Sequence, residues 1–264
     1  MQRKVMIAIT AGLVVLAVAA TAYAATAINT YGAKLSFTTK KAGTAKKPAT
    51  IGYTENLTAA GTNGNRTGLI DDIKTTIYGL KASTKKLPTC SSSKIAAASS
   101  DSSCPKGALL ATGYITAIVG SPTNFTPSDP TAFNCDPVLD VWNSGGGNLT
   151  YFFVDTGPHL CVPLKTGDVG PYPGTMKQVG KNLVVNTPIP SFVNRPLGGA
   201  LAGSLETEHL VWAKSSKTSK GKTVPVLQSV ACKSGKRPWS VDYTATLPTT
   251  NVTQSQTISG KSAC

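Results

Sequence analysis

Few residues in this chain are of the types that perform catalysis, so their spacing is the first thing to examine. Glu206 and Glu208 are two positions apart, and in a strand their carboxyls would share one face, roughly 7 Å apart. Glycosidases hold their acid and base carboxyls at about this separation. The pair therefore defines one hypothesis, a secreted glycan hydrolase. Asp71 and Asp72 are adjacent and would point to opposite faces of a strand.

The histidines offer little to a serine hydrolase. His159 lies in a short Gly-Pro loop beside Cys161, and His209 lies on an expected strand, where a solvated position is the simpler interpretation. No Gly-x-Ser-x-Gly segment is present to expose a nucleophile. We expect a protein that is not an enzyme and that carries no cofactor or metal.

The cysteines indicate structural bridges. Zinc sites use closely spaced cysteine pairs, whereas the spacings here are wide. An even number of cysteines in an exported chain predicts three disulfides. Nearest-neighbour pairing is expected because each pair brackets a loop or a hairpin: Cys90 with Cys104, Cys135 with Cys161, and Cys232 with Cys264.

The beginning of the chain has the pattern of an export signal. Arg3 and Lys4 precede the uncharged apolar run 5–20, and Ala22-Tyr23-Ala24 suits cleavage after Ala24. An uncleaved membrane anchor is the alternative, although the run is short of the ~20 residues that span a bilayer. We expect residues 1–24 to be a signal peptide and residues 25–264 to be secreted or associated with the cell envelope.

The remainder of the chain has the pattern of short strands separated by turns. Residues 239–246 alternate between apolar and polar, and Ile73, Thr75 and Ile77 share one face. Gly- and Pro-rich clusters separate such runs, which favours an all-β, antiparallel β-sandwich of the immunoglobulin-like or jelly-roll-like kind. No linker of biased composition divides residues 25–264, so we expect one unit, with two smaller sandwiches as the alternative.

Two local predictions follow from turn residues. A turn at 247–250 would fold residues 251–258 against 239–246, with Ala245 opposite Val252 and Trp239 opposite Ile258. The segment 101–120 contains Cys104 and two glycines, but it fits neither a phosphate loop nor a redox site. It is interpreted as a disulfide-stapled turn that leads into a buried strand.

A family resemblance is carried by turn and cysteine motifs. They are Lys41-Ala42-Gly43-Thr44 with Lys47-Pro48, Leu87-Pro88-Thr89-Cys90, and Cys104-Pro105-Lys106-Gly107 with Ala111-Thr112-Gly113. In these the chain resembles an uncharacterised family of exported proteins from high-GC Gram-positive bacteria, over roughly residues 30–120. The resemblance implies an envelope or extracellular setting, and it implies no activity or site.

Charge carries the functional expectation. The formal net charge is +14, and removing Arg3 and Lys4 with the leader gives 14 − 2 = +12. Basic loops attract polyanions over long distances, and the alternative is a merely solubilising surface. Arginine is rare, so specific nucleic-acid recognition is not expected. We predict a non-enzymatic, envelope-associated structural or adhesion-type module that contacts anionic wall polymer or acidic glycan through two loops: Lys40, Lys41, Lys46 and Lys47, and Lys214, Lys217, Lys220 and Lys222.

Overall fold

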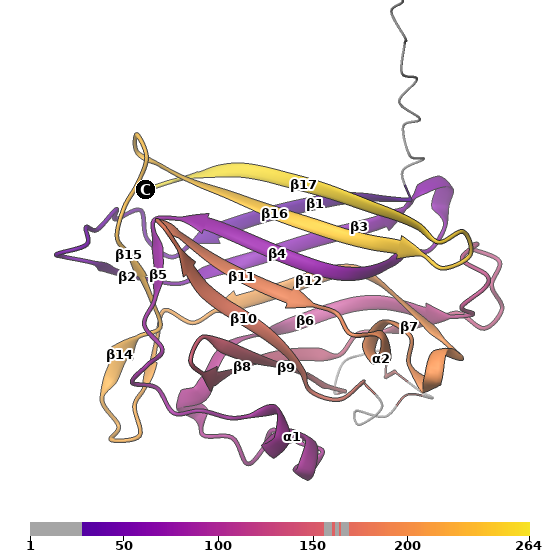
Figure 1. Cartoon of the computed structure of the whole chain (residues 1–264), viewed down its shortest axis with the longest axis horizontal. Helices are drawn as coiled ribbons and strands as arrows, with labels where there is room; N and C mark the ends of the chain where they lie inside the picture. Colours follow the sequence, from indigo (N-terminus) through magenta and orange to yellow (C-terminus); the bar gives the residue numbers. More distant parts are fainter. Residues whose placement is uncertain (1–27, 156–159, 162–163, 165–168) are drawn as a thin grey trace, which may run out of the picture.

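The structure, a computed structural model, describes residues 28–155, 160, 161, 164 and 169–264. The expected signal peptide and His159 lie outside these residues. Most of the strands in the described chain belong to one antiparallel sheet (Figure 1). Its strand order is β1 (Asn29–Phe37), β3 (Tyr53–Gly61), β12 (Ala202–Trp212), β6 (Leu109–Gly120), β8 (Val138–Gly145), β9 (Asn148–Val154), β10 (Tyr172–Val179), β11 (Asn182–Pro188), β4 (Leu69–Tyr78), β16 (Lys236–Leu247) and β17 (Val252–Ala263). A short strand, β7 (Phe133–Cys135), pairs with β6.

The sheet curls until its first and last strands, β1 and β17, lie side by side. Side chains rather than a ladder join these two edges. The Gln254 amide accepts from the backbone N–H groups of Ile28 and Asn29 and donates to the Asn29 carbonyl. The expected all-β antiparallel class is thus confirmed. A β-sandwich would enclose its core between two packed sheets. Here one large sheet folds back on itself into a near-barrel and encloses the core alone.

Alternation along the strands explains why the sheet curls around an apolar interior. Ile73, Thr75 and Ile77 of β4 are buried, as are Leu183 and Val185 of the neighbouring β11. The four apolar residues among these belong to one hydrophobic cluster that reaches almost every strand of the sheet. Period-two burial on each strand places one face of the whole sheet inside. The interior is therefore a packed core.

Two small sheets extend one end of the main sheet. The first has the order β2 (Ala49–Ile51), β15 (Leu227–Ser229) and β5 (Leu80–Ala82), and the second is the hairpin of β13 (Ser215–Lys217) and β14 (Thr223–Pro225). Val224, Val226, Gln228 and Val230 alternate in the sequence, a pattern that predicts one shared strand face. The structure instead breaks this run between β14 and β15, because Val226 donates to the Lys214 carbonyl outside any strand.

Helices are few among the described residues. They are α1 (Ser92–Ala98), α2 (Ser191–Asn194) and the 3-10 turns η1 (Thr62–Gly64), η2 (Lys106–Ala108) and η4 (Leu197–Gly199). The sequence predicted only a Ser/Ala-rich loop between Cys90 and Cys104. The structure places α1 there, because the Ser91 hydroxyl accepts from the Lys94 N–H as an N-cap and Ser99 ends the helix in the left-handed region.

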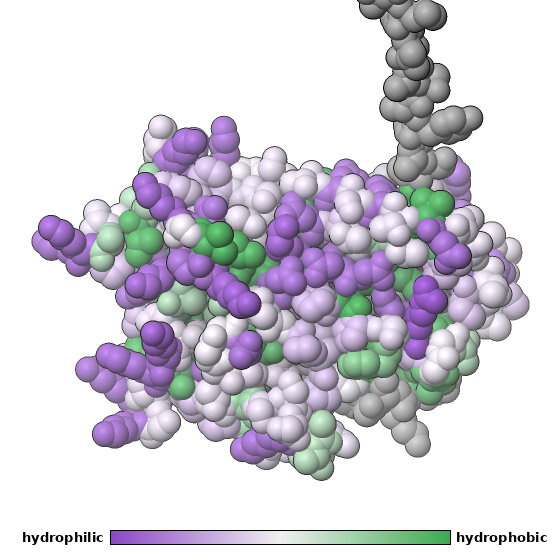
Figure 2. Space-filling model, viewed as in Figure 1, coloured by the Kyte–Doolittle hydropathy of each residue, from purple (hydrophilic) through white to green (hydrophobic). Residues whose placement is uncertain are grey.

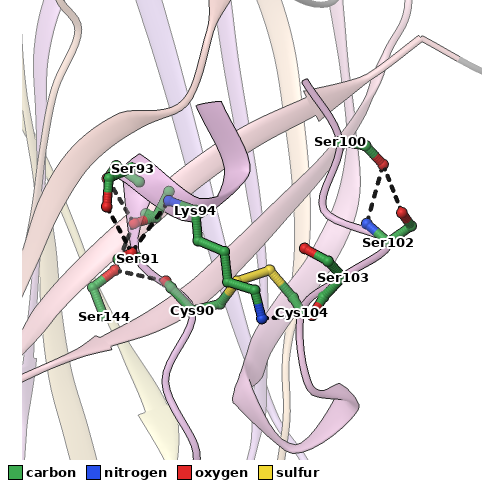
Figure 3. The surroundings of a disulfide bond; sticks show 11 residues. Cys90, Ser91, Ser93, Lys94, Ser100, Ser102, Ser103, Cys104 and Ser144 are labelled. Atoms are coloured by element: carbon green, nitrogen blue, oxygen red, sulfur yellow. Dashed lines mark hydrogen bonds between the residues drawn. A yellow bond between two sulfur atoms is a disulfide. The ribbon is translucent and has the colours of Figure 1, made fainter. Parts of the chain in front are cut away.

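The three disulfides form the expected pairs: Cys90–Cys104, Cys135–Cys161 and Cys232–Cys264. Figure 3 shows the first of them holding α1 and the turn that follows it, where the Lys94 ammonium donates to the Ser103 carbonyl. The stapled turn leads directly into η2 and the long strand β6, as predicted for residues 101–120. Each bridge stabilises the folded protein by about 2–4 kcal/mol, because it restricts the conformations of the unfolded chain.

The register of the last hairpin differs from the prediction. Ala245 pairs with Gln254 and Trp239 with Gly260, because the connecting turn begins after Leu247 and Asn251 adopts a positive φ of 54°. The shift is by two residues, so each side chain keeps its predicted face. Gly260 is suited to its position, since a Cβ there would lie 2.2 Å from the Trp239 ring.

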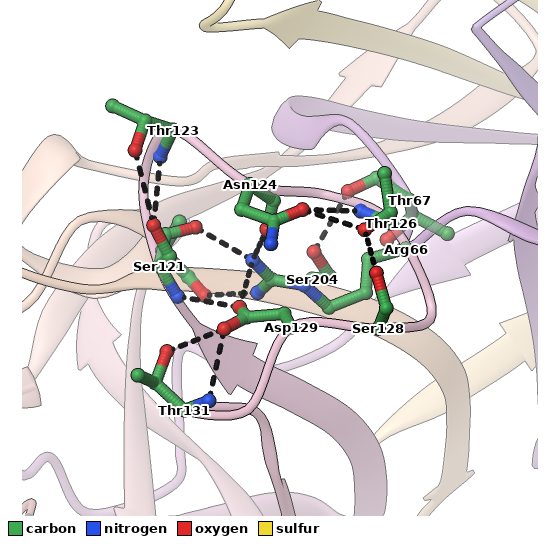
Figure 4. Close-up of polar contacts among 11 residues, drawn as sticks. Arg66, Thr67, Ser121, Thr123, Asn124, Thr126, Ser128, Asp129, Thr131 and Ser204 are labelled. Carbon is green, nitrogen blue, oxygen red and sulfur yellow. Dashed lines mark hydrogen bonds and ion pairs between the residues drawn. The ribbon is translucent and has the colours of Figure 1, made fainter.

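A buried ion pair holds the long loop that follows β6 (Figure 4). The Arg66 guanidinium lies 3.1 Å from the Asp129 carboxylate and donates to the carbonyls of Ser121, Asn124 and Ala202. Asp129 accepts in addition from the Ser121 N–H. Desolvation tends to raise the pKa of Asp129, but the hydrogen bonds that it accepts from Thr131 and Ser121 and the charge of Arg66 hold this pKa below its usual range. This end of the near-barrel is fixed by polar contacts.

Candidate functional site

The lysines singled out by the sequence gather at one end of the molecule. All eight are exposed: Lys40, Lys41, Lys46, Lys47, Lys214, Lys217, Lys220 and Lys222. They lie on the loop between β1 and β2 and on the β13–β14 hairpin, and Figure 2 shows hydrophilic side chains projecting on the side where Figure 1 shows these loops. The structure therefore brings together residues that lie about 170 positions apart in the sequence.

The segment around β15 joins the two lysine loops. The Ser229 hydroxyl donates to the Ala42 carbonyl, which holds the β1–β2 loop, and Gly43 approaches Ser229 too closely to carry a side chain. Val226 donates to the Lys214 carbonyl and accepts from the Ser83 N–H, which adds the turn after β5 to the same end. These hydrogen bonds hold the loops in fixed relative positions.

The charge of this end is uniform. Segments 38–52, 79–91 and 213–235 contain no aspartate or glutamate, and they add further exposed lysines to the predicted eight: Lys81, Lys85, Lys86 and Lys233. Within the described part of the chain, the two ion pairs are Arg66–Asp129 and Lys74–Asp242, so none of these lysines is paired. We refer to these twelve lysines together as the lysine-rich end.

The carboxyls Glu206 and Glu208 do not form the predicted pair. The β12–β6 ladder shifts register between Leu205 and Thr207, which makes Glu206 the extra residue of a bulge. Glu206 and Thr207 consequently face outward, where the Thr207 and Thr116 hydroxyls are 2.8 Å apart, and Glu208 faces the interior. The hypothesis of a hydrolase that uses these two residues loses its geometric basis.

The interior neighbour of Glu208 is a different glutamate, Glu55 of β3. Leu210 pairs with Glu55 and Glu208 with Leu57, so the two carboxyls are diagonal neighbours on the inner face, at roughly 7 Å between Cβ atoms. Sequence reasoning missed Glu55. The signal was present, because Tyr53, Glu55 and Leu57 alternate with polar residues and Glu55 therefore occupies an inward position.

The two buried carboxyls differ in their hydrogen bonds. Glu55 accepts from the Thr75 hydroxyl at 2.5 Å and from the Trp212 indole N–H at 3.2 Å. Glu208 has no hydrogen-bond donor among the described residues. Burial raises the pKa of Glu55, and burial together with the neighbouring Glu55 raises the pKa of Glu208 to about 8. Glu208 therefore holds a proton at neutral pH in most molecules.

Glu208 also lines a cavity of about 90 Å³. Other lining residues belong to α2, which lies at the end of the near-barrel opposite the lysine-rich end (Figure 1). The cavity walls are apolar and include Ile73, Ile115, Phe153 and Leu205. Residues of α2 and the turn after it cover one side. The sequence did not predict a cavity, because its lining comes from strands that are far apart in the chain.

The remaining candidates are placed as follows. His209 faces outward, where its ring stacks on Tyr114 and its Nδ1 lies 2.6 Å from the Asn56 side-chain oxygen, as a solvated face position predicts. A bulge at Asp71 turns Asp71 and Asp72 to the same outer side, against the expectation of opposite faces; there Asp71 accepts from Thr246. Among the described residues, no cluster of His, Cys, Asp or Glu is arranged to hold a metal.

Comparison with protein-family models, with curated proteins and with solved structures finds no match for this chain. The resemblance to exported proteins of high-GC Gram-positive bacteria therefore stays a prediction. Within the described residues, no helix has the length and apolar character needed to cross a membrane. Three disulfides fit a protein of an oxidising, extracellular setting.

Proposed function

We propose that this protein is a secreted, non-enzymatic module of the cell envelope that binds anionic wall polymer or acidic glycan through its lysine-rich end. The observation that supports the proposal most is the gathering of exposed lysines at that end, from three chain segments that contain no aspartate or glutamate. A solubilising surface does not require its charges to be gathered in this way. Anionic polymer is the partner that such a surface attracts most strongly.

Lysine chemistry fits a repetitive polymer better than a single defined ligand. The lysine ammonium is a compact, strongly hydrated charge on a flexible stem, whereas bidentate recognition of one phosphate or carboxylate favours arginine. Each exposed contact contributes about 1 kcal/mol or less. Retention therefore depends on several lysines acting together and weakens as salt shortens the screening length to about 8 Å near 0.15 M.

The experiment compares binding to isolated cell walls at low and at physiological salt. Replacing Lys214, Lys217, Lys220 and Lys222 by glutamine should weaken binding about tenfold or more at low salt, if each contact contributes a few tenths of a kcal/mol. The wild-type protein should also lose retention steeply as salt rises.

A matched control removes the same charge elsewhere. Its four substitutions, at Lys34, Lys74, Lys94 and Arg195, lie outside the two lysine loops. The control should keep most of the wild-type binding. Equal loss in both variants would mean that net charge alone governs binding, and unchanged binding in the lysine-loop variant would leave these lysines as solubilising surface.

A further inference from the structure

The cavity beside Glu208 is unusual because two of its buried side chains present polar atoms that have no hydrogen-bond partner among the described residues. Glu208 is 9% exposed and accepts no hydrogen bond from the described residues. Asn194 of α2 is 6% exposed, and its side-chain oxygen is buried without a partner. Both residues line the same cavity. A buried polar group without a partner costs about 1–3 kcal/mol, so two in one cavity call for an explanation.

The hydrogen bonds of the Asn194 side-chain nitrogen explain how the oxygen of the same amide is held in place. The Asn194 amide nitrogen lies 3.3 Å from the Ile70 carbonyl and 3.3 Å from the Asp71 carboxylate, so it donates to the start of β4. Because the nitrogen is held in this way, the oxygen of the same amide remains available as an acceptor. Tyr172 adds a third polar group to the lining, and its ring stacks on Tyr151.

The rest of the lining determines what kind of molecule fits. Apart from these groups the walls are mainly aliphatic and aromatic, and exposed Phe192 and Leu197 adjoin the cavity-lining Val193 and Pro196. An apolar cavity of about 150 Å³ holds a benzene ring. The cavity here, at about 90 Å³, encloses most of one ring or a short branched chain, and its mouth leaves room for the remainder.

We propose that this cavity binds a small, uncharged apolar molecule that carries one hydroxyl group, such as a phenol. A hydroxyl both donates and accepts, so it satisfies an acceptor such as the Asn194 oxygen or a donor such as protonated Glu208. A ligand carboxylate would lose its hydration against the apolar walls and would lie near the carboxyl of Asp155, which also lines the cavity, so a charged acid is disfavoured. The site is distinct from the lysine-rich end, because none of the twelve lysines of that end is among the described residues that line it.

The test is a series of ring compounds that differ in head group: phenol, benzene, benzoate and benzylamine. Isotope-labelled isoleucine methyl groups report binding, since Ile73 and Ile115 line the cavity. Phenol should shift these signals saturably at pH 7, benzene should bind about tenfold more weakly for want of a hydrogen bond, and benzoate should not bind.

Variants assign the head-group preference to Glu208. Glu208→Leu should bring phenol binding down to the level of benzene, and Glu206→Leu, on the outer face of the same strand, should leave it unchanged. Equal wild-type affinity for benzene and phenol would overturn the proposal, as would tighter binding of benzylamine. No shift with any compound would mean that the cavity holds only water, and this too would overturn it. None of these results bears on wall binding.

Discussion

At the residue scale, the two interior glutamates are both buried, but they differ in the hydrogen bonds that they accept and therefore in how strongly their pKa values are raised. Glu55 lies between the Thr75 hydroxyl and the Trp212 indole, and both hydrogen bonds favour its ionised form against the cost of burial. Glu208 has burial and the Glu55 charge acting on it, without such hydrogen bonds. Proton uptake on folding is therefore expected mainly at Glu208.

This difference predicts that stability falls as pH rises. Below about pH 4.5 Glu208 is protonated in both the folded and the unfolded chain, and its contribution is constant. Between about 4.5 and about 8 the folded protein holds a proton that the unfolded chain has released, so each rise in pH favours unfolding. The total loss from this group is on the order of a few kcal/mol.

The measurement is urea unfolding at several pH values across this window. Glu208→Gln should remove most of the decline and should be more stable than the wild type at pH 8. Glu206→Gln is the control, and it should keep most of the decline because that side chain is partly exposed. An unchanged decline in Glu208→Gln would place the titrating group elsewhere.

Sequence reasoning at this scale found Glu208 but assigned it the wrong partner. Counting by two from Glu206 assumes an unbroken strand, and one extra residue in β12 reverses the faces. Nothing in the residue types at 205–207 marks that bulge. The lysines were predicted correctly as exposed, because no partner of opposite charge is needed to keep a lysine in water.

At the scale of elements, the bulge in β12 is what permits both of its halves to contribute to the interior. Gly203 and Leu205 line the cavity on one side of Glu206, and Glu208 and Leu210 face inward on the other. The ladder partners Ala117 and Thr116 on β6 are consecutive, so Glu206 is the residue without a counterpart.

Deleting Glu206 should therefore be tolerated. The deletion makes Leu205 and Thr207 neighbours, restores unbroken pairing with β6 and keeps every inward side chain inward, so we expect a loss of about 1 kcal/mol in the free energy of unfolding. Deleting His209 is the matched control: it would turn Leu210 and Trp212 outward and should prevent folding. Thermal unfolding followed by circular dichroism distinguishes the two, and similar damage from both deletions would contradict the bulge.

Alternation and turn residues predicted most strands, and the disulfide pairs followed from them. The helix α1 was missed because its stability comes from the Ser91 cap and the adjacent disulfide rather than from an apolar stripe; Ile95 is its one buried side chain. The register of the last hairpin was off by two, since Pro248 and Asn251 belong to the turn and a turn of the same length can start at either of two positions.

At the scale of the whole molecule, the feature that alternation could not predict is closure of the sheet. An inward face looks the same in sequence whether it packs on a second sheet or across the interior of one curled sheet. Here the edges β1 and β17 meet through side chains, with Ser262 donating to the Leu35 carbonyl and Gln254 bonded to Ile28 and Asn29. The Gln254 side chain provides hydrogen bonds between β1 and β17, which do not pair through their backbones.

Gln254→Ala should weaken this seam. It removes the three hydrogen bonds that join the two edges, together with one to Gln256 on the same strand. At about 0.5–1.5 kcal/mol each, the three that join the edges account for a loss of about 2–4 kcal/mol. Hydrogen exchange should speed up at the amides of Ile28 and Asn29 and along β17 while β8 and β9 stay protected. Ser259→Ala, which changes an exposed residue of the same strand, is the control. Uniform acceleration across the sheet would instead indicate global unfolding.

The separation between the lysine-rich end and the cavity has a consequence for orientation. With the positive charge crowded at one pole of the strands, the molecule carries an electric dipole along its length. Approaching a negatively charged wall, such a molecule turns before it touches, and it comes to rest on its basic pole. A protein bound to the wall as proposed would have α2 turned toward the surrounding medium, and the proposed small-molecule site would then face away from the wall.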